Sequence, residues 1–190
     1  NIVMILVFTG NGKGKTTAAL GQAVRALGQG KKVLVIQFIK GPWLSGEHIF
    51  FKRFRFHASR FKIIRTGKGF VKILGDKLPF KEHQKAAREG LNFVSKAIKS
   101  KKYDLIILDE INNAVDLKLL SAKEVLTVLK PFRVSQRFGQ RKSATSSDVI
   151  LTGRNAPKSF IKIADLVTEM KEIKHPFQKN NKSARPGIEF

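Results

Sequence analysis

The chain has 190 residues, of which 42% are hydrophobic, and this composition suits a packed core in a single domain over 1–190. It contains no cysteine, which excludes disulfides, thiolate metal sites and cysteine nucleophiles. No apolar run reaches the length of a membrane span and no signal peptide is evident, so we expect a cytoplasmic protein without membrane contact. The formal net charge is +23, from 37 Lys and Arg against 14 Asp and Glu.

This charge has two interpretations. It can be a lysine-rich, solvated surface, or it can mark a polyanionic partner such as nucleic acid. No nucleic-acid motif accompanies it, which favours the solvated surface, so a nucleic-acid partner is not expected although the charge does not exclude one.

Strand-like apolar runs alternate with helical patterns along the chain. In chain order, we expect a strand at Ile2–Phe8, a helix at Lys15–Leu27, strands at Val33–Phe38 and Phe61–Arg65, a helix across Phe80–Ile98, a strand at Leu105–Leu108, a helix with a Ser121–Glu124 capping box, a strand at Val149–Thr152, a helix opened by Pro157, and a strand at Leu166–Met170. Such alternation predicts an α/β fold with a mainly parallel sheet and helices on both faces.

Two basic stretches interrupt this pattern. No acidic residue lies between Glu47 and Asp76, where phenylalanines alternate with lysines and arginines. That alternation fits a strand with one buried face, which we favour, or an aromatic, cationic platform for nucleic acid. The second basic stretch lies at about 130–147, where we expect a loop.

The segment after the first strand resembles a phosphate-binding P-loop, G-x-x-x-x-G-K-[ST]. Gly14, Lys15 and Thr16 fit the end of that motif, while Thr9 occupies the place of its first glycine. Gly10 and Gly12 can supply the tight turn instead. Backbone N–H groups at the start of the following helix attract phosphate, Lys15 adds a positive charge, and the Thr16 hydroxyl can reach Mg²⁺.

A pair of carboxylates follows the apolar run of "YDLIILDE". Asp109 and Glu110 stand where P-loop proteins keep the carboxylate that holds Mg²⁺, although a solvated acidic strand end would look similar. Arg154 follows another strand and can contact phosphate or lie free on the surface. The four histidines are scattered without metal-ligand spacing, and we interpret them as surface or structural residues.

Several stretches together resemble one family, the ATP:corrinoid adenosyltransferases of the P-loop type. They are, in order, "VFTGNGKGKTTAALG", "GKKVLVIQFIKG", "LIILDE", "ILTGRNAP", "ADLVTEM", "KHPF" and "GIEF". The resemblance implies a RecA-like parallel sheet, a homodimer, ATP with Mg²⁺, a reduced corrinoid as second substrate, and a reductase or flavodoxin-like electron donor.

The resemblance also implies roles for individual residues. Lys15 and Glu110 would be catalytic, Thr16 and Glu110 would hold Mg²⁺, and Gly69 and Phe70 would begin a corrinoid-binding loop. The ATP-binding residues would be Gly10, Asn11, Gly12, Lys13, Gly14, Lys15, Thr16, Thr17 and Arg154. The family usually carries Gly-Phe-Thr-Trp in the corrinoid loop, whereas this chain has Lys72 in place of the tryptophan.

The implied reaction transfers the 5′-deoxyadenosyl group of ATP to cobalt and releases triphosphate, in adenosylcobalamin synthesis or salvage. The P-loop would then hold the leaving group. Two alternatives remain. A basic, RecA-like P-loop ATPase that binds nucleic acid would use the same loop and would explain the charge better. A carrier that has lost activity would explain Lys72.

Overall fold

The computed structural model describes residues 3–53, 59–73, 75–132, 147–174 and 187–188. In this part of the chain six strands form one sheet in the order β3-β2-β4-β5-β1-β6, and every neighbouring pair is parallel. The strands are β1 (Ile5–Thr9), β2 (Val33–Gln37), β3 (Phe61–Arg65), β4 (Leu105–Asp109), β5 (Asp148–Thr152) and β6 (Leu166–Glu169). This confirms the predicted α/β fold with a parallel sheet.

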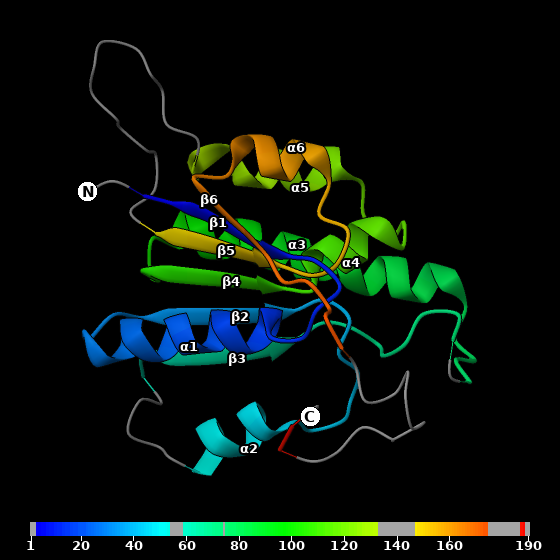
Figure 1. Cartoon of the computed structure of the whole chain (residues 1–190), viewed down its shortest axis with the longest axis horizontal. Coiled ribbons are helices and arrows are strands. Elements are labelled where there is room, and N and C mark those ends of the chain that lie inside the picture. Colours follow the sequence, from blue (N-terminus) through cyan, green and yellow to red (C-terminus); the bar gives the residue numbers. More distant parts are fainter. Residues whose placement is uncertain (1–2, 54–58, 74, 133–146, 175–186, 189–190) are drawn as a thin grey trace.

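Helices cover both faces of the sheet (Figure 1). On one face, α1 (Lys15–Gly28) packs small residues such as Ala19 and Ala23 against β2 and β4. The other face carries the larger core, built by four helices: α3 (Phe80–Ser100), α4 (Ile111–Asp116), α5 (Ala122–Leu129) and α6 (Lys158–Ile163). Because β2 and β4 are buried on both faces, they read as continuous apolar runs in the sequence.

The strands lie close to the predicted ranges, but the first begins later than expected. Met4 N–H and Ile5 N–H donate to the carboxylates of Asp148 and Asp165, at 2.9 and 2.8 Å. The Ser121–Glu124 capping box is present at the start of α5. A short 3₁₀ turn, η2 (Lys130–Phe132), follows α5, and the rest of the expected basic loop, residues 133–146, lies outside the described residues.

The strand favoured for the phenylalanine-rich stretch is wrong at its beginning. Residues Gly46–Arg53 form a helix, α2, and the described chain returns to strand only at β3. Glu47 in the first turn and Arg53 in the last complement the helix dipole. The ring of Phe51 stacks on Phe61 at 3.6 Å between centroids, so helix and strand pack on each other through this pair of rings.

Parallel pairing brings the carboxyl ends of all six strands to one edge of the sheet, at the right in Figure 1. Gln37 at the end of β2 is the register partner of Asp109 at the end of β4, and Phe8 in β1 is the partner of Thr152 in β5. Ligands of open α/β sheets bind at this edge. None of the helices in the described ranges is long and apolar enough to cross a lipid bilayer.

Candidate active site

The glycine-rich loop between β1 and α1 depends on close backbone contact with the segment after β6. Gly12 N–H donates to Met170 O at 2.7 Å, and a Cβ on Gly10 would lie 2.4 Å from that same oxygen. Gly10 and Gly14 have positive φ angles of 95° and 117°. Glycine is therefore favoured at both positions by backbone conformation, and at Gly10 also by the lack of space for a side chain.

Thr9 has a task of its own in the position where the motif usually has glycine. Its hydroxyl accepts the Ala156 N–H at 3.1 Å, and this bond ties the loop to the segment after β5. That segment carries Arg154. The substitution in the motif thus fixes two parts of the site relative to each other.

At the start of α1 the backbone N–H groups of the helix face a cavity without a side-chain cap. Gly14 at the N-cap has no side chain to bond the first N–H groups, which leaves them for a ligand. Lys15 Nζ donates to Gly12 O at 2.6 Å. Burial and the nearby charge of Arg154 lower the pKa of Lys15, and the carboxylates of Glu110 and Glu172 oppose this shift.

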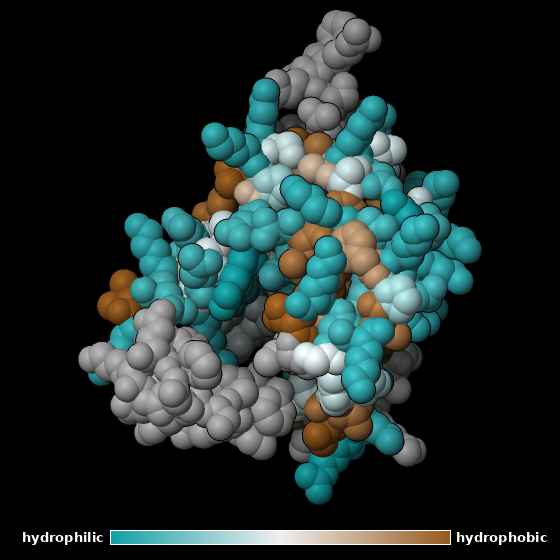
Figure 2. Space-filling model, turned by 90° about the vertical axis from the view of Figure 1, so that its right-hand side faces the viewer, coloured by the Kyte–Doolittle hydropathy of each residue, from teal (hydrophilic) through white to brown (hydrophobic). Residues whose placement is uncertain are grey.

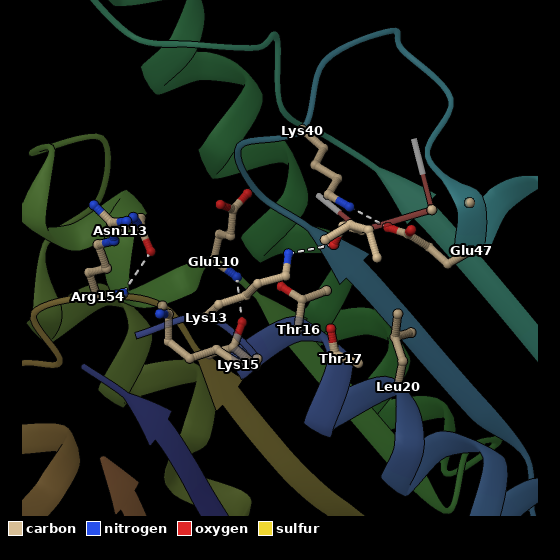
Figure 3. A pocket seen from close by; sticks show the side chains of 16 residues that line it. Lys13, Lys15, Thr16, Thr17, Leu20, Lys40, Glu47, Glu110, Asn113 and Arg154 are labelled. Atoms are coloured by element: carbon tan, nitrogen blue, oxygen red, sulfur yellow. Dashed lines mark hydrogen bonds and ion pairs between the residues drawn. The ribbon is translucent and has the colours of Figure 1, made fainter. Parts of the chain in front are cut away.

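The cavity at this edge has a volume of about 560 Å³, which is the size of a small-molecule site (Figure 3). It is lined by Lys13, Gly14, Lys15, Thr16, Thr17, Leu20, Lys40, Gly46, Glu47, Glu110, Asn113, Thr152, Gly153, Arg154, Gly187 and Ile188. In the space-filling view of this edge, a hollow lies between hydrophilic residues on one side and hydrophobic residues on the other (Figure 2).

The two carboxylates after β4 have different surroundings. Asp109 is fully buried and accepts hydrogen bonds from Thr16 Oγ1 at 2.8 Å, Thr152 Oγ1 at 2.7 Å and Gln37 Nε2 at 3.1 Å. Glu110 lines the cavity in a left-handed conformation with φ 62°. Burial and the neighbouring Asp109 raise the pKa of Glu110 to about 7. The direct partner of Thr16 is therefore Asp109, while Glu110 faces the space above.

Arg154 reaches the cavity from the turn after β5. Its backbone N–H donates to Asn113 Oδ1 at 2.9 Å, so α4 holds the turn in place. A Cβ on Gly153 would lie 2.3 Å from the same oxygen. Glycine is thus required just before Arg154.

Sequence reasoning missed several residues of the cavity. Lys40 and Glu47 form an ion pair beside it, on the segment that leads from β2 into α2. Burial would raise the pKa of Glu47, but hydrogen bonds from Lys40 and Ser45 outweigh that effect and lower it to about 2. The available signal was the position of Lys40 shortly after the carboxyl end of a parallel strand, whereas Glu47 follows ten positions after Gln37 and carried no such signal.

The two expected corrinoid residues, Gly69 and Phe70, lie outside the cavity lining. Both belong to the loop after β3, and the Phe70 ring lies 5.7 Å from the ring of Trp43. These two side chains, which we call the Trp43–Phe70 pair, are 60% and 46% exposed. Lys72 does not join them, because its Nζ lies over the Phe80 ring at 4.3 Å from the centroid.

Comparison with known proteins identifies the family. A family profile described as ATP:corrinoid adenosyltransferase BtuR/CobO/CobP matches residues 2–190. The chain belongs to the ATP:corrinoid adenosyltransferase family. It is 36% identical to the corrinoid adenosyltransferase of Escherichia coli K12 and 35% identical to that of Salmonella typhimurium, over 98% of this chain and 85% of each relative.

A solved structure supports the fold alone. The KaiC-like protein PH0186 of Pyrococcus horikoshii superposes with a TM-score of 0.53 at 17% identity, over 92% of this chain and 75% of that one. Membership of the adenosyltransferase family makes this protein an enzyme that transfers an adenosyl group from ATP to a corrinoid. Nothing in the comparisons favours the nucleic-acid-binding ATPase considered from the charge.

Proposed function

We propose that the cavity binds ATP with its triphosphate on the loop 10–17. The observation that carries this proposal is the convergence of Lys15, Arg154 and the uncapped start of α1 on one space. Lys13 and Lys40 add further positive charge to the lining. A triphosphate is the part of ATP that this concentration of donors suits.

The residues at the edge of the sheet also suit Mg²⁺. Hard oxygen donors are what this ion prefers, and Thr16 and Glu110 supply a hydroxyl and a carboxylate at the cavity, while the buried Asp109 beneath them accepts the Thr16 hydroxyl. Among the described residues no group of three His, Cys, Asp or Glu could hold a metal by itself. Mg²⁺ in nucleotide sites takes one or two carboxylates and completes its shell with phosphates and waters. When bound, it would neutralise charge on the triphosphate.

The chemistry follows from the leaving group. Cobalt(I) of the reduced corrinoid supplies an electron pair to C5′ of the ribose, a cobalt–carbon bond forms, the C5′–oxygen bond breaks, and triphosphate leaves with the other pair. No proton has to be removed, so no general base is required. The protein contributes positioning and stabilisation of developing negative charge, which falls to Lys15, Arg154 and the loop N–H groups.

The corrinoid would approach from the Trp43–Phe70 pair. The loop that carries Trp43 continues directly into Gly46 and Glu47 of the cavity lining, so the pair and the cavity share one segment. Exposed aromatic rings suit a broad, flat macrocycle. With Lys72 turned onto Phe80, Phe70 is the side chain of its loop that contacts Trp43.

The decisive experiment incubates the purified protein with ATP and chemically reduced cobalamin. We expect adenosylcobalamin and inorganic triphosphate as products, whereas a nucleic-acid-binding ATPase would yield ADP and phosphate. Lys15→Ala should lower kcat about 100-fold or more, because it removes a positive charge from the leaving group. Lys31→Ala, an exposed lysine after α1, is the matched control and should leave the rate unchanged.

If Lys15→Ala keeps near-normal activity while folded, the assignment of the triphosphate to this loop is wrong.

The family resemblance further suggests a single-domain homodimer in the cytoplasm that receives electrons from a reductase or flavodoxin-like protein. Light scattering of the purified protein tests the dimer.

A further inference from the structure

One buried amide joins two carboxylates that come from different segments. Gln37, the last residue of β2, is fully buried. Its Nε2 donates to Asp109 Oδ2 at 3.1 Å and to Glu47 Oε1 at 3.2 Å. The two N–H groups of one side chain thus connect Asp109, at the strand end under the P-loop, with Glu47 in the first turn of α2.

The orientation of this amide is fixed by its neighbours. Gln37 Oε1 is buried and has no hydrogen-bond partner among the described residues. Turning the amide over would place this oxygen against two carboxylates, so the observed orientation is the favourable one. A buried acceptor without a partner is rare and costs free energy. The two hydrogen bonds donated by Nε2 are therefore made although they leave Oε1 without a hydrogen bond.

On one side the link leads to the phosphate loop. Asp109 also accepts the Thr16 hydroxyl at 2.8 Å. A metal–triphosphate bound at the loop competes for that hydroxyl. Asp109 then loses a donor and depends more strongly on Gln37.

On the other side the link leads to the loop that carries Trp43. Glu47 pairs with Lys40, whose Nζ also donates to Ser45 Oγ at 3.1 Å, so the two charged residues bracket the segment 41–45. Arg65 Nη1 donates to the carbonyls of Pro42 and Trp43 at 2.6 and 3.0 Å from the end of β3. An exposed tryptophan is therefore held on a backbone that is clamped from both ends.

We propose that Gln37 is a positioning residue that links nucleotide occupancy of the P-loop to the placement of Trp43. Its amide transmits a change at Asp109 to Glu47, and Glu47 sets the segment 41–45 against Phe70. The inference rests on the proposed ATP site, and it adds an order of events: bound nucleotide prepares the surface that receives the second substrate.

The chain offers a direct probe, because Trp43 is its only tryptophan. In the wild type, titration with Mg·ATP should change the tryptophan emission. Gln37→Met keeps the volume of the side chain but removes both donors. Calorimetry should show Mg·ATP binding by this variant within about threefold of the wild type, while the emission change is lost and KM for the corrinoid rises about tenfold or more, the usual size for loss of an outer-shell partner.

Thr66→Val is the matched control. It removes the 3.3 Å bond from Thr66 Oγ1 to the Gln37 carbonyl and leaves the amide untouched, so emission response and KM should match the wild type. If Gln37→Met does not fold, Glu47→Leu breaks the same link from the other end and must show the same loss of response.

The outcomes separate this inference from the proposed function. A folded Gln37→Met protein with a full emission response and an unchanged corrinoid KM overturns the inference. A wild type that binds Mg·ATP by calorimetry without any change in emission overturns it as well. Failure of the wild type to bind Mg·ATP would instead overturn the placement of ATP.

Discussion

At the scale of single residues, Asp109 and Glu110 are adjacent in sequence and have separate tasks. Three side chains donate to Asp109, which is fully buried, whereas Glu110 faces the cavity. We expect Asp109→Ala to destabilise the fold by about 3 kcal/mol or more, because buried donors lose their acceptor. Glu110→Ala should leave the melting temperature nearly unchanged and raise the half-saturating Mg²⁺ concentration about tenfold.

Thermal melts and Mg²⁺ titrations of the adenosylation rate measure the two effects. If Glu110→Ala keeps the metal dependence of the wild type, Glu110 is not at the metal. If Asp109→Ala melts like the wild type, the three hydrogen bonds contribute little to stability.

The acid stability of the protein should depend on Glu47. Its pKa of about 2 lies below the ordinary 4.5, so its ionised form is favoured in the folded state. The resulting stabilisation is complete above pH 4.5, and it is lost as the pH falls toward 2. It amounts to at most about 3 kcal/mol, of which more than half disappears between pH 6 and pH 3.

Urea unfolding of the wild type and Glu47→Gln at these two pH values measures this contribution. The difference in free energy of unfolding between the two proteins should shrink at pH 3. An equal difference at both pH values would show that the ion pair with Lys40 does not set the pKa of Glu47.

Much of the site was predictable at this scale, and the unpredicted part has a clear cause. The loop residues from Lys13 to Thr17 line the cavity and are consecutive, so a local motif is enough to predict them, whereas the predicted Gly10, Asn11 and Gly12 are not among the lining residues. Glu110 and Arg154 were found because each follows an apolar run. The hydrogen bond from Thr16 to Asp109 and the two hydrogen bonds donated by the Gln37 amide depend on strand register, which a single sequence does not reveal.

At the scale of elements, local signals decided the outcome where they were strong. The strands follow apolar runs of the expected length, and α5 begins at its capping box. The helix α2 was missed because the alternation of phenylalanine and basic residues belongs to the sequence that follows it, whereas Gly46–Arg53 itself holds no period-two pattern, and its Phe51 packs on Phe61. Six-residue α4 has no long periodic pattern, so it too escaped prediction.

The capping box permits a test of one element. Ser121 Oγ accepts the Glu124 N–H at 3.2 Å, and Glu124 Oε2 accepts the Ser121 N–H at 2.7 Å. Ser121→Ala should cost about 1 kcal/mol and lower the melting temperature by about 2–4 °C, because one helix N–H group loses its acceptor. Calorimetric melting measures the shift.

Thr127→Ala is the control within the same helix. Thr127 Oγ1 donates to the carbonyl of Lys123 within the same helix. Loss of this hydrogen bond should be nearly neutral for stability, because such side-chain bonds to the preceding turn contribute little to a helix. Equal melting temperatures for Ser121→Ala and the wild type would show that α5 is held by its buried residues Val125 and Leu129 alone.

At the scale of the whole molecule, parallel strand order explains how distant residues meet. The sequence separates Thr16 from Asp109 by 93 positions, yet both lie at the carboxyl edge because β4 and the strand before the loop run in one direction. The alternation of strands and helices predicted that edge. The order of the strands within the sheet could be learned only from the structure.

The net charge of +23 is the remaining property of the whole molecule, and the described structure favours a solvated surface for much of it. The outer face of α3 carries exposed cations opposite a buried apolar face, as an amphipathic helix does; these are Lys81, Lys85, Arg88, Lys96 and Lys99. Other cations already have partners within the protein, such as Arg65 on loop carbonyls and Lys72 on Phe80.

Binding to random duplex DNA should therefore be weak at low salt and should disappear between about 50 and 200 mM salt, because affinity carried by phosphate contacts falls steeply as counterions compete. Fluorescence anisotropy of a labelled duplex across this range measures it, and the adenosylation rate measured with the same duplex present should not change. Tight binding that persists at physiological salt, or a rate that responds to DNA, would show that the charge has a nucleic-acid partner in addition to the triphosphate of ATP.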